Sequence, residues 1–389
     1  MILNSLLKIR GITVPWSVRF KSILSSLETS RILISSSNDI YTNLAIEHWL
    51  YTNLRFNPKE GSLISPIVFL WIDSPSVVIG KHQNPWIEST LGFVEHSGIK
   101  LARRFSGGGC VYHDENNINI SIIGNREVFG NRQEHLKFLS NVLKDKYGIE
   151  CHPTSRHDLR HTATGSKMSG SASRLGQQNS YHHFTLLVDS DKDVMTTAIR
   201  QEDQNFIQSN STSSIRSQVV NLSELKPDLS TNTVIDDLAQ EYGKIYEVPG
   251  SKKGGYRTAA ALCDEENASL AQITSKLKDW EWIYGQTPRF TLQRQISLFE
   301  DGVEKQVKFV VQINKGRFES FKIEGDSIKN NPERNFDHLL GAKFSYKESV
   351  PVIARMFKTD TDVPLETNSI GFERVFATHL LHMIHGANF

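Results

Sequence analysis

The hydrophobic and polar positions along the chain follow two different periods. Residues 67–73 (IVFLWID) and 76–80 (SVVIG) are apolar runs separated by a Ser-Pro pair, which predicts two buried strands joined by a tight turn. Residues 117–123 (NINISII) alternate isoleucine with polar residues, and this period of two predicts a half-buried strand. Residues 41–54 instead place apolar residues near helical spacing, so we expect a helix there.

The rest of the chain continues this mixture of strands and helices. The further elements that we expect are strands at 31–37 and 183–189, helices at 132–147 and 234–246, and a polar loop at 200–235 with a short apolar element around 219–225. Beyond Gly285 and Pro288, three strand-like segments separated by turn residues precede helical material. The pattern predicts an α+β fold with a large mixed-sheet domain at 31–286 and a small accessory domain at 291–389.

The first thirty residues differ in composition from the rest. They carry Lys8, Arg10, Arg19 and Lys21, no acidic residue before Glu28, and repeated serines among large apolar residues. This composition is typical of a mitochondrial transit peptide, so we expect residues 1–30 to be a presequence and the protein to act in the mitochondrial matrix. A disordered or strand-forming N-terminus is the alternative. A secretory signal fits less well, because Lys8 and Arg10 interrupt any apolar core.

Composition excludes several classes of protein. The chain is 38% hydrophobic and 22% charged, which is ordinary for a soluble globular protein. Its net charge of +1 does not indicate nucleic-acid binding, and no apolar run is long enough for a membrane span. Three widely spaced cysteines, Cys110, Cys151 and Cys263, fit a reducing compartment and argue against a disulfide framework or a zinc site. The balanced charge is compatible with a monomer.

The stretch RRFSGGGCVYHD, residues 103–114, has the most concentrated candidate chemistry. Three consecutive glycines let backbone N–H groups turn toward a ligand with no Cβ in the way, which suits a phosphate or a flat base. Arg103 and Arg104 add positive charge that can hold a carboxylate or phosphate in two places. The spacing is neither that of a Walker A loop nor that of the dinucleotide fingerprint. The structural alternative is a hairpin bend flanked by surface arginines.

Cys110 raises the question of a nucleophilic thiol. His113 or one of His182 and His183 could activate it. A thiol that follows a glycine loop in an apolar Val-Tyr context is more often a small packed residue, so we favour packing.

A second polar cluster spans residues 155–174. Lys167 stands among small residues (GSKMSGS), which lets its ammonium enter a pocket while the backbone passes close to a ligand. Arg156 and Asp158 could line the same pocket. The alternative for Lys167 is a solvated loop lysine.

Two further segments could complete this site. His182 and His183 precede an apolar strand, and adjacent strand residues point to opposite faces, so at most one of them faces a ligand and the pair does not chelate a metal. Thr212, Ser214 and Arg216 lie in the polar loop and could close over a bound anion, unless this is only a surface loop. Together these groups predict a site of backbone amides and cations without a metal.

The chain resembles lipoate–protein ligases and mitochondrial lipoyltransferases of the biotin/lipoate protein ligase family. The motifs that carry the resemblance, in family order over about residues 31–290, are NDIYTNLAIEHWL, SPSVVIGKHQNPWIE, IKLARRFSGGGCVYHD, GSKMSGSASR, YHHFTLLVD, IRSQVVNLSEL and WEWIYGQTPRF. The resemblance implies a class II synthetase-like α+β catalytic domain, followed by the small accessory domain of the longer ligases. Phe105 departs from the small or basic residue usual at its position, and we expect it to reshape the pocket rim.

The resemblance also implies the reaction and the residues that perform it. Lipoate or octanoate would be attached to one lysine of a lipoyl domain through an acyl-adenylate, with Lys167 as the catalytic residue that steadies the developing charge. Arg104 and the backbone of the glycine loop would hold the adenylate; the loop residues are Gly107, Gly108, Gly109, Cys110, Val111 and Tyr112. The remaining pocket positions are Arg156, Asp158, His183 and Thr185, and those of the covering loop are Thr212 and Ser214.

The origin of the acyl group divides the family. A ligase makes lipoyl-AMP from ATP and lipoate, with Mg²⁺, whereas a transferase takes a preactivated or carrier-bound acyl group. SPSVVIGKHQNPW and WEWIYGQTPRF resemble the transferases, and IRSQVVNLSEL resembles the ligases. The acceptors implied are lipoyl domains of 2-oxoacid dehydrogenase complexes and the glycine-cleavage carrier protein. A non-catalytic carrier-binding scaffold is the competing class, against which Lys167 and the intact glycine loop argue.

Overall fold

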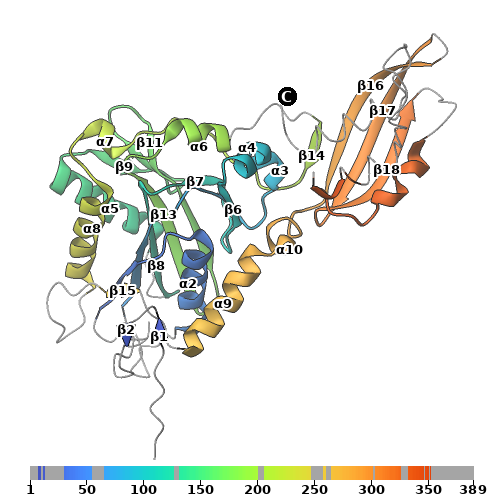
Figure 1. Ribbon diagram of the computed structural model, residues 1–389. Helices are drawn as coiled ribbons and strands as arrows, with labels where there is room; N and C mark the ends of the chain where they lie inside the picture. Colours follow the sequence, from blue (N-terminus) through green and yellow to red (C-terminus); the bar gives the residue numbers. More distant parts are fainter. Residues whose placement is uncertain are drawn as a thin grey trace, which may run out of the picture.

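A mixed six-stranded sheet forms the centre of the larger part of the protein in this computed structural model (Figure 1). Its strand order is β12-β13-β8-β4-β3-β15, with β3 parallel to both of its neighbours and the remaining pairs antiparallel. The strands are β3 (Ile32–Ser35), β4 (Ile67–Trp71), β8 (Asn117–Asn125), β12 (Ser171–Leu175), β13 (Asn179–Leu187) and β15 (Arg257–Ala259). The described residues are 8–9, 12–13, 30–54, 65–126, 131–199, 206–246, 257–259, 264–300, 303–325, 332–345, 347–349 and 351.

Helices cover both faces of this sheet. On one face α5 (Arg132–Tyr147) and α8 (Thr231–Ile245) bury leucine and valine side chains, and on the other face lie α2 (Ile40–Asn53) and α9 (Asp264–Lys278) (Figure 1). The ends of α5 follow from its sequence: the Asn131 side chain accepts from the N–H of Gln133, and Gly148 takes the left-handed conformation. The short helices are α3 (Pro85–Glu88), α4 (Leu91–His96), α6 (Lys192–Ala198), α7 (Leu222–Leu225) and α10 (Trp280–Ile283).

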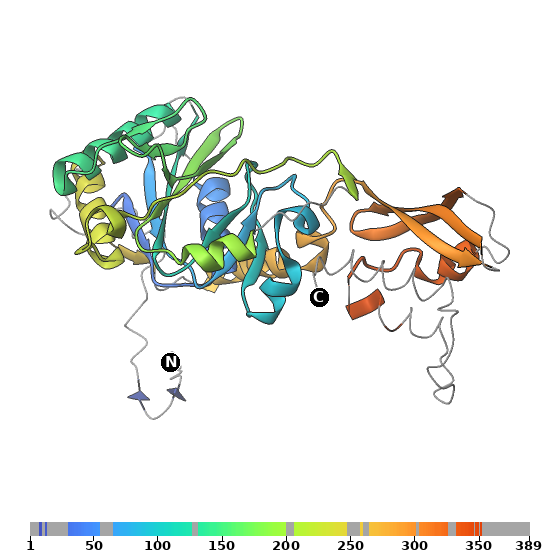
Figure 2. The ribbon, with the colours of Figure 1, turned by 90° about the horizontal axis from the view of Figure 1, so that it is seen from above.

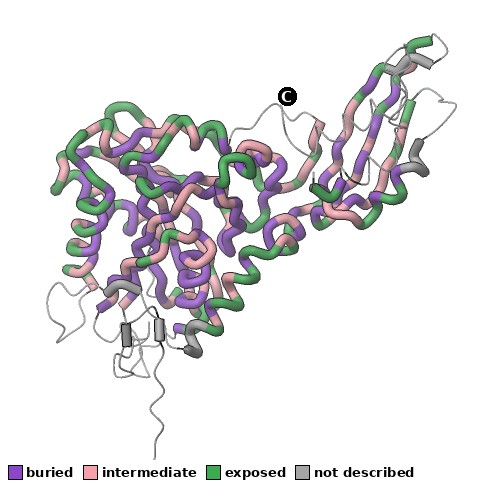
Figure 3. The backbone as a smooth tube through the Cα atoms, viewed as in Figure 1, coloured by how far each residue is buried: buried purple, intermediate pink, exposed green. Residues whose placement is uncertain are grey.

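The sequence prediction of a half-buried strand at 117–123 is wrong. Strand β8 is buried on both faces, as the buried colour of the central strands shows (Figure 3). Ile118, Ile120 and Ile122 face the α5–α8 side, while the alternating polar residues are buried toward α2. They are stabilised there by hydrogen bonds: Ser121 donates to the carboxylate of Glu47 at 2.6 Å and Asn119 donates to that of Asp73 at 3.4 Å. Buried polar partners, and not solvent, therefore explain the alternation.

A second, three-stranded sheet carries the glycine-rich stretch. Its order is β6-β5-β7, with β5 (Ser76–Ile79), β6 (Lys100–Arg103) and β7 (Val111–His113). Strands β4 and β5 are buried as expected, but they belong to different sheets and do not pair with each other. The glycine run connects β6 to β7. A third small sheet, β11-β10-β9, comprises β9 (Cys151–Pro153), β10 (Leu159–His161) and β11 (Lys167–Ser169).

The C-terminal part is an antiparallel sheet of order β14-β16-β17-β18, at one end of the elongated molecule (Figure 2). The expected three strands are present as β16 (Phe290–Glu300), β17 (Val303–Asn314) and β18 (Arg317–Gly325), followed by the 3₁₀ helix η1 (Pro332–Leu339). The fourth strand, β14 (Ile207–Ser209), comes from the long polar loop and pairs with the start of β16. The expected presequence, apart from β1 (Lys8–Ile9), β2 (Ile12–Thr13) and residue 30, lies outside the described residues. None of the described helices could cross a membrane.

Arg103 joins the glycine-loop sheet to the segment that leads into the C-terminal sheet. Its guanidinium is fully buried and donates to the carbonyl of Gln83 at 2.8 Å, to that of Ile283 at 2.8 Å and to the hydroxyl of Thr287 at 2.9 Å. In return, the indole N–H of Trp282 donates to the carbonyl of Arg103 at 2.7 Å. One side chain thus fixes the connecting segment against the larger part of the protein.

We expect Arg103→Met to destabilise the protein by roughly 3 kcal/mol or more, because several buried acceptors lose their donor at once and each loss costs about 1–3 kcal/mol. Urea unfolding followed by tryptophan fluorescence measures this effect. Arg126→Met is the control, since the Arg126 side chain is exposed and its guanidinium donates to the carbonyl of Gly176. A loss no larger than that of the control would show that Arg103 is not a structural residue.

Candidate active site

The glycine loop between β6 and β7 approaches another backbone segment more closely than a side chain would allow. A Cβ on Gly80, just after β5, would lie 2.2 Å from the carbonyl oxygen of Gly108. Gly108 itself has φ +89°, a conformation that strongly favours glycine. These two glycines fix the path of the loop at the surface of the sheet.

Arg104 holds the inside of this loop. Its buried guanidinium donates to the carbonyls of Gly107 at 2.7 Å, Gly109 at 2.6 Å and Val78 at 2.9 Å. Because these carbonyls point inward to the arginine, Arg104 shapes the loop from behind.

Lys167 is the first residue of β11, in the small sheet beside the large one. Its backbone N–H donates to the carbonyl of Gln218 at 2.7 Å, and its carbonyl accepts from Val220 at 3.0 Å. Gly170 makes room for the lysine side chain, since a Cβ there would lie 3.2 Å from the Lys167 ammonium. Thr185 on β13 holds Gly170 by accepting from its N–H at 3.0 Å. The ammonium is thereby directed along a path lined by small groups.

The ammonium of Lys167 pairs with Asp158. Nζ lies 2.9 Å from Oδ1, and the two side chains are only 24% and 16% exposed. Arg160, on β10, reaches the same region and donates to the carbonyl of Gly165 at 2.7 Å and to the hydroxyl of Ser217 at 3.0 Å. The first cavity is therefore lined by several cations and by the carboxylate of Asp158.

Two adjoining cavities meet at Lys167. The first, of about 280 Å³, reaches inward to the buried side chains of Leu44, Trp71 and Val78. The second, of about 260 Å³, lies against Leu187 and Met195. The residues that border both cavities are Cys110, Val111, Lys167, Gly170, Thr185, Ser214, Ile215 and Ser217. A ligand that filled both cavities would pass the lysine ammonium at its middle.

The segment of residues 210–218, which we call the cover loop, is fastened over this junction. The Ser214 hydroxyl donates to the buried carboxylate of Glu88 and accepts from the backbone N–H of Cys110 at 2.8 Å. The side-chain amide of Gln83 also donates to Ser214, at 3.0 Å. The cover loop is thus bound to the glycine loop and to the segment after β5.

A buried hydrogen-bonded chain supports the floor of the first cavity. Nδ1 of His183 lies 2.9 Å from Oε1 of Glu47, and its Nε2 lies 3.3 Å from the hydroxyl of Ser106. Burial alone would raise the pKa of Glu47, but the charge and hydrogen bond of His183 and the hydrogen bond of Ser121 together lower it. As strand alternation predicts, His183 lines the cavity, and His182 is buried on the other face against His135.

The thiol of Cys110 is not placed for nucleophilic attack. Burial and the nearby Glu88 charge raise its pKa well above the ordinary range, which keeps the thiol protonated. Its hydrogen bond goes to the carbonyl of Val111 at 3.9 Å. His113, a candidate activator, is bonded instead to the buried Asp73 at 2.8 Å. The geometry supports the packing interpretation.

The structure brings nearly all of the site residues expected from the sequence to one place. Those that border the first cavity are Arg104, Gly108, Gly109, Cys110, Val111, Arg156, Asp158, Lys167, His183, Thr185, Thr212 and Ser214. Tyr112 borders the second cavity, whereas Gly107 borders neither.

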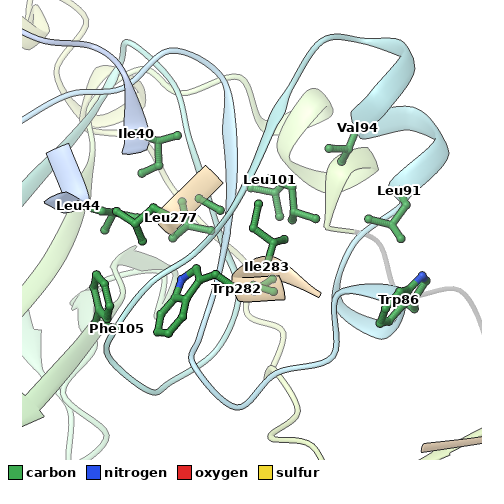
Figure 4. Close-up of a cluster of buried hydrophobic side chains, with 14 of the residues drawn as sticks. Ile40, Leu44, Trp86, Leu91, Val94, Leu101, Phe105, Leu277, Trp282 and Ile283 are labelled. Carbon is green, nitrogen blue, oxygen red and sulfur yellow. The ribbon is translucent and has the colours of Figure 1, made fainter. Parts of the chain in front are cut away.

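The expectation for Phe105 is wrong. Its ring borders neither cavity and is buried behind the loop, stacked on His48 with ring centroids 3.7 Å apart. On another side it lies near Trp282, with ring centroids 4.7 Å apart (Figure 4). The sequence did not identify three residues that border the cavities, Arg160, Glu88 and Trp71. For Glu88 the one available signal was its place at the end of the motif SPSVVIGKHQNPWIE. Within the described part of the chain, no group of three or more histidine, cysteine, aspartate or glutamate side chains could hold a metal ion.

Comparisons with known proteins agree with this geometry. The profile of the lipoyl protein ligase A/B catalytic domain matches residues 39–243. The human mitochondrial lipoyl amidotransferase LIPT1 is 34% identical over 86% of this chain and 87% of its own length. Lipoate-protein ligase A of Psychrobacter cryohalolentis is 32% identical over 67% of this chain and 74% of its own length.

A solved structure shares the fold. The crystal structure of Plasmodium falciparum LipL1 in complex with lipoate has a TM-score of 0.53 and 23% identity, over 92% of this chain and 99% of its own. The expected class II synthetase-like α+β fold is confirmed.

The lowered pKa of Glu47 gives a prediction for stability. As the pH falls, the Glu47 carboxylate is protonated at a higher pH in the unfolded chain than in the folded protein. The stability that the ionised carboxylate contributes is therefore complete above its ordinary pKa of 4.5 and is lost as the pH falls through the lowered pKa. Glu47→Gln should cost about 2 kcal/mol at pH 7 and less in acid. Unfolding by urea at several pH values measures this, with the exposed Glu134→Gln as control. A cost that is the same at every pH would contradict the assignment.

Proposed function

Because the chain belongs to the lipoyl protein ligase A/B catalytic domain family, it is an enzyme that attaches lipoyl groups to protein lysines, and we propose that it does so through an acyl-adenylate held at Lys167. The observation that carries the proposal is the position of the Lys167 ammonium at the junction of two cavities. A mixed anhydride of an acyl group and AMP has two unlike halves joined at one reactive centre. The cavities would hold the halves, and Lys167 would lie at the centre.

The linings of the two cavities support an assignment of the halves. The first cavity enters the protein interior between Leu44, Trp71 and Val78, which suits an apolar acyl chain. The second is bordered by Tyr112, Leu187 and further apolar side chains, with polar groups of the cover loop at its edge. That combination suits a flat base attached to a polar sugar.

The role proposed for Lys167 is electrostatic. Its ammonium would contact the phosphate and acyl carbonyl oxygens and stabilise the negative charge that develops as the acceptor amine attacks. Glycine-loop and cover-loop groups would hold the adenylate in place, so that the reaction needs no nucleophile from the enzyme. The protonated, packed thiol of Cys110 agrees with this.

For the origin of the acyl group, we propose an ATP-dependent ligase. Besides the apolar residues that would hold the acyl chain, the first cavity is bordered by Arg104, Arg156, Arg160 and Lys167, the last of which it shares with the second cavity. This number of cations suits the phosphates of ATP, which would bring Mg²⁺ with them. A second candidate is a lipoyl amidotransferase that takes the acyl group from a carrier protein. It is favoured by the 34% identity to human LIPT1 over most of both chains.

The same relatives support a location and a set of partners. The human and mouse relatives are named as mitochondrial, and residues 1–30 have the composition of a transit peptide, so we place the protein in the mitochondrial matrix. Its acceptors would be lipoyl domains of 2-oxoacid dehydrogenase complexes and the glycine-cleavage carrier protein, and it would act as a monomer.

Purified protein incubated with an apo lipoyl domain and one donor at a time tests the proposal. Labelling with lipoate, ATP and Mg²⁺ indicates a ligase. Labelling only with supplied lipoyl-AMP or with a lipoylated carrier protein indicates a transferase. No labelling with any donor would refute both candidates.

Lys167→Ala should lower the rate of transfer from lipoyl-AMP by about 100-fold or more, because one preorganised charge at such a centre contributes about that much. A single-turnover assay with preformed lipoyl-AMP measures it. Lys192→Ala is the control, since Lys192 forms an exposed pair with Glu224 away from the cavities. Full activity of the Lys167 variant would refute the role given to this residue.

Cys110→Ala should keep most of the transfer activity, because the thiol is protonated and only its backbone N–H faces the cover loop. The same single-turnover assay measures this. A complete loss in a folded variant would restore the acyl-cysteine mechanism.

A further inference from the structure

The ion pair between Lys167 and Asp158 places a carboxylate against the cation that borders both cavities. Among the described residues that line the first cavity, Asp158 is the one carboxylate. Its Oδ1 lies 2.9 Å from Nζ of Lys167, and both side chains are more than three-quarters buried. A carboxylate repels a phosphate, so Asp158 is poorly suited to be the adenylate ligand that its sequence position suggested.

The local backbone holds the Asp158 carboxylate at the cavity. The N–H of Asp158 donates to the hydroxyl of Thr154 at 3.2 Å, and its carbonyl accepts from the N–H of Thr154 at 2.8 Å. His157, just before it, has φ +60°, which is uncommon for a residue other than glycine. Ser171 stabilises that turn by donating to the carbonyl of His157 at 2.6 Å. The carboxylate is therefore placed by a rigid turn.

The other groups near the cavities that could accept a proton are engaged elsewhere. His183 is held between Glu47 and Ser106, and His113 is bonded to Asp73. Glu88, which borders the second cavity, accepts from Ser214 in the cover loop. Asp158 differs because its cation is Lys167, and an anionic adenylate would compete for that same cation.

We propose that Asp158 exchanges Lys167 for the acceptor lysine and serves as the general base that deprotonates it, an inference that rests on the proposed acyl-adenylate function. When the phosphate pairs with Lys167, the Asp158 carboxylate is left beside the reacting centre without its cation. The incoming ammonium of the lipoyl domain replaces that charge. The ion pair thus orients the nucleophile as well as accepting its proton.

The step balances as follows in atoms and charges. The acceptor ammonium gives one proton to the Asp158 carboxylate, and the freed nitrogen lone pair forms the C–N bond to the acyl carbon. The bond from that carbon to the phosphate oxygen breaks, and its electron pair leaves with AMP. The second proton lost from the nitrogen goes to the departing phosphate. Asp158, which is 16% exposed, then releases its proton to solvent.

Asp158→Asn tests this role in the full-length protein with preformed lipoyl-AMP and an apo lipoyl domain, without ATP. Single-turnover transfer at neutral pH should fall by about 100-fold or more, the usual contribution of a general base. The rate of the variant should recover as the pH rises toward the pKa of the free lysine. Asp145→Asn, an exposed change on α5 outside both cavities, is the matched control and should transfer normally.

A second nucleophile separates this role from adenylate binding and from misfolding. Hydroxylamine is unprotonated at neutral pH, so it needs no base, and its reaction with bound lipoyl-AMP should proceed at the wild-type rate in Asp158→Asn. If the variant loses the hydroxylamine reaction equally, Asp158 holds the adenylate or the fold, and the proposal is wrong. It is also wrong if the variant transfers normally from lipoyl-AMP and fails only with ATP and Mg²⁺.

The same assay distinguishes failure of the inference from failure of the proposed function. Wild-type protein that transfers to neither the lipoyl domain nor hydroxylamine would refute the acyl-adenylate function itself. Wild-type transfer combined with an unchanged Asp158→Asn variant would refute only the role of Asp158.

Discussion

The close approach of Gly108 to Gly80, with the Arg104 guanidinium behind it, is the constraint on which the site depends. It lets a loop lie flat against a sheet and turns its carbonyls inward to a buried cation. With those carbonyls satisfied, the loop surface that remains can face a ligand or the cover loop. Both cavities border this loop, and Lys167 reaches their junction from a separate sheet.

Arg103, the last residue of β6, and Arg104, which follows it, bind different parts of the protein. Arg103 points toward the connecting segment and binds Ile283 and Thr287, whereas Arg104 points into the glycine loop. These two consecutive side chains therefore connect the wall of the site to the segment that leads into the C-terminal sheet. Both arginines bind protein carbonyls, and Arg104 also borders the first cavity, whereas Lys167 borders both cavities.

Local signals made much of the fold and site predictable. Helix α5 follows from apolar spacing and its caps, and the opposite orientation of His182 and His183 follows from strand geometry. Contacts distant in sequence were not predictable. The alternation of isoleucine and polar residues in β8 suggests that one face is exposed to solvent. In the structure the polar residues are buried and donate hydrogen bonds to Glu47 and Asp73. Similarly, the Arg-Phe motif does not reveal that Phe105 packs behind the loop against His48.

Strand β14 connects the cover loop to the C-terminal sheet. The cover loop begins at a strand hydrogen-bonded to β16 and ends beside the strand that carries Lys167. A shortened gene that ended before β16 would leave β14 without its partner strand, and the cover loop would keep only its contacts with the larger part of the protein. Loss of the C-terminal sheet during evolution would therefore require a new partner for β14, either elsewhere in the chain or on a separate polypeptide.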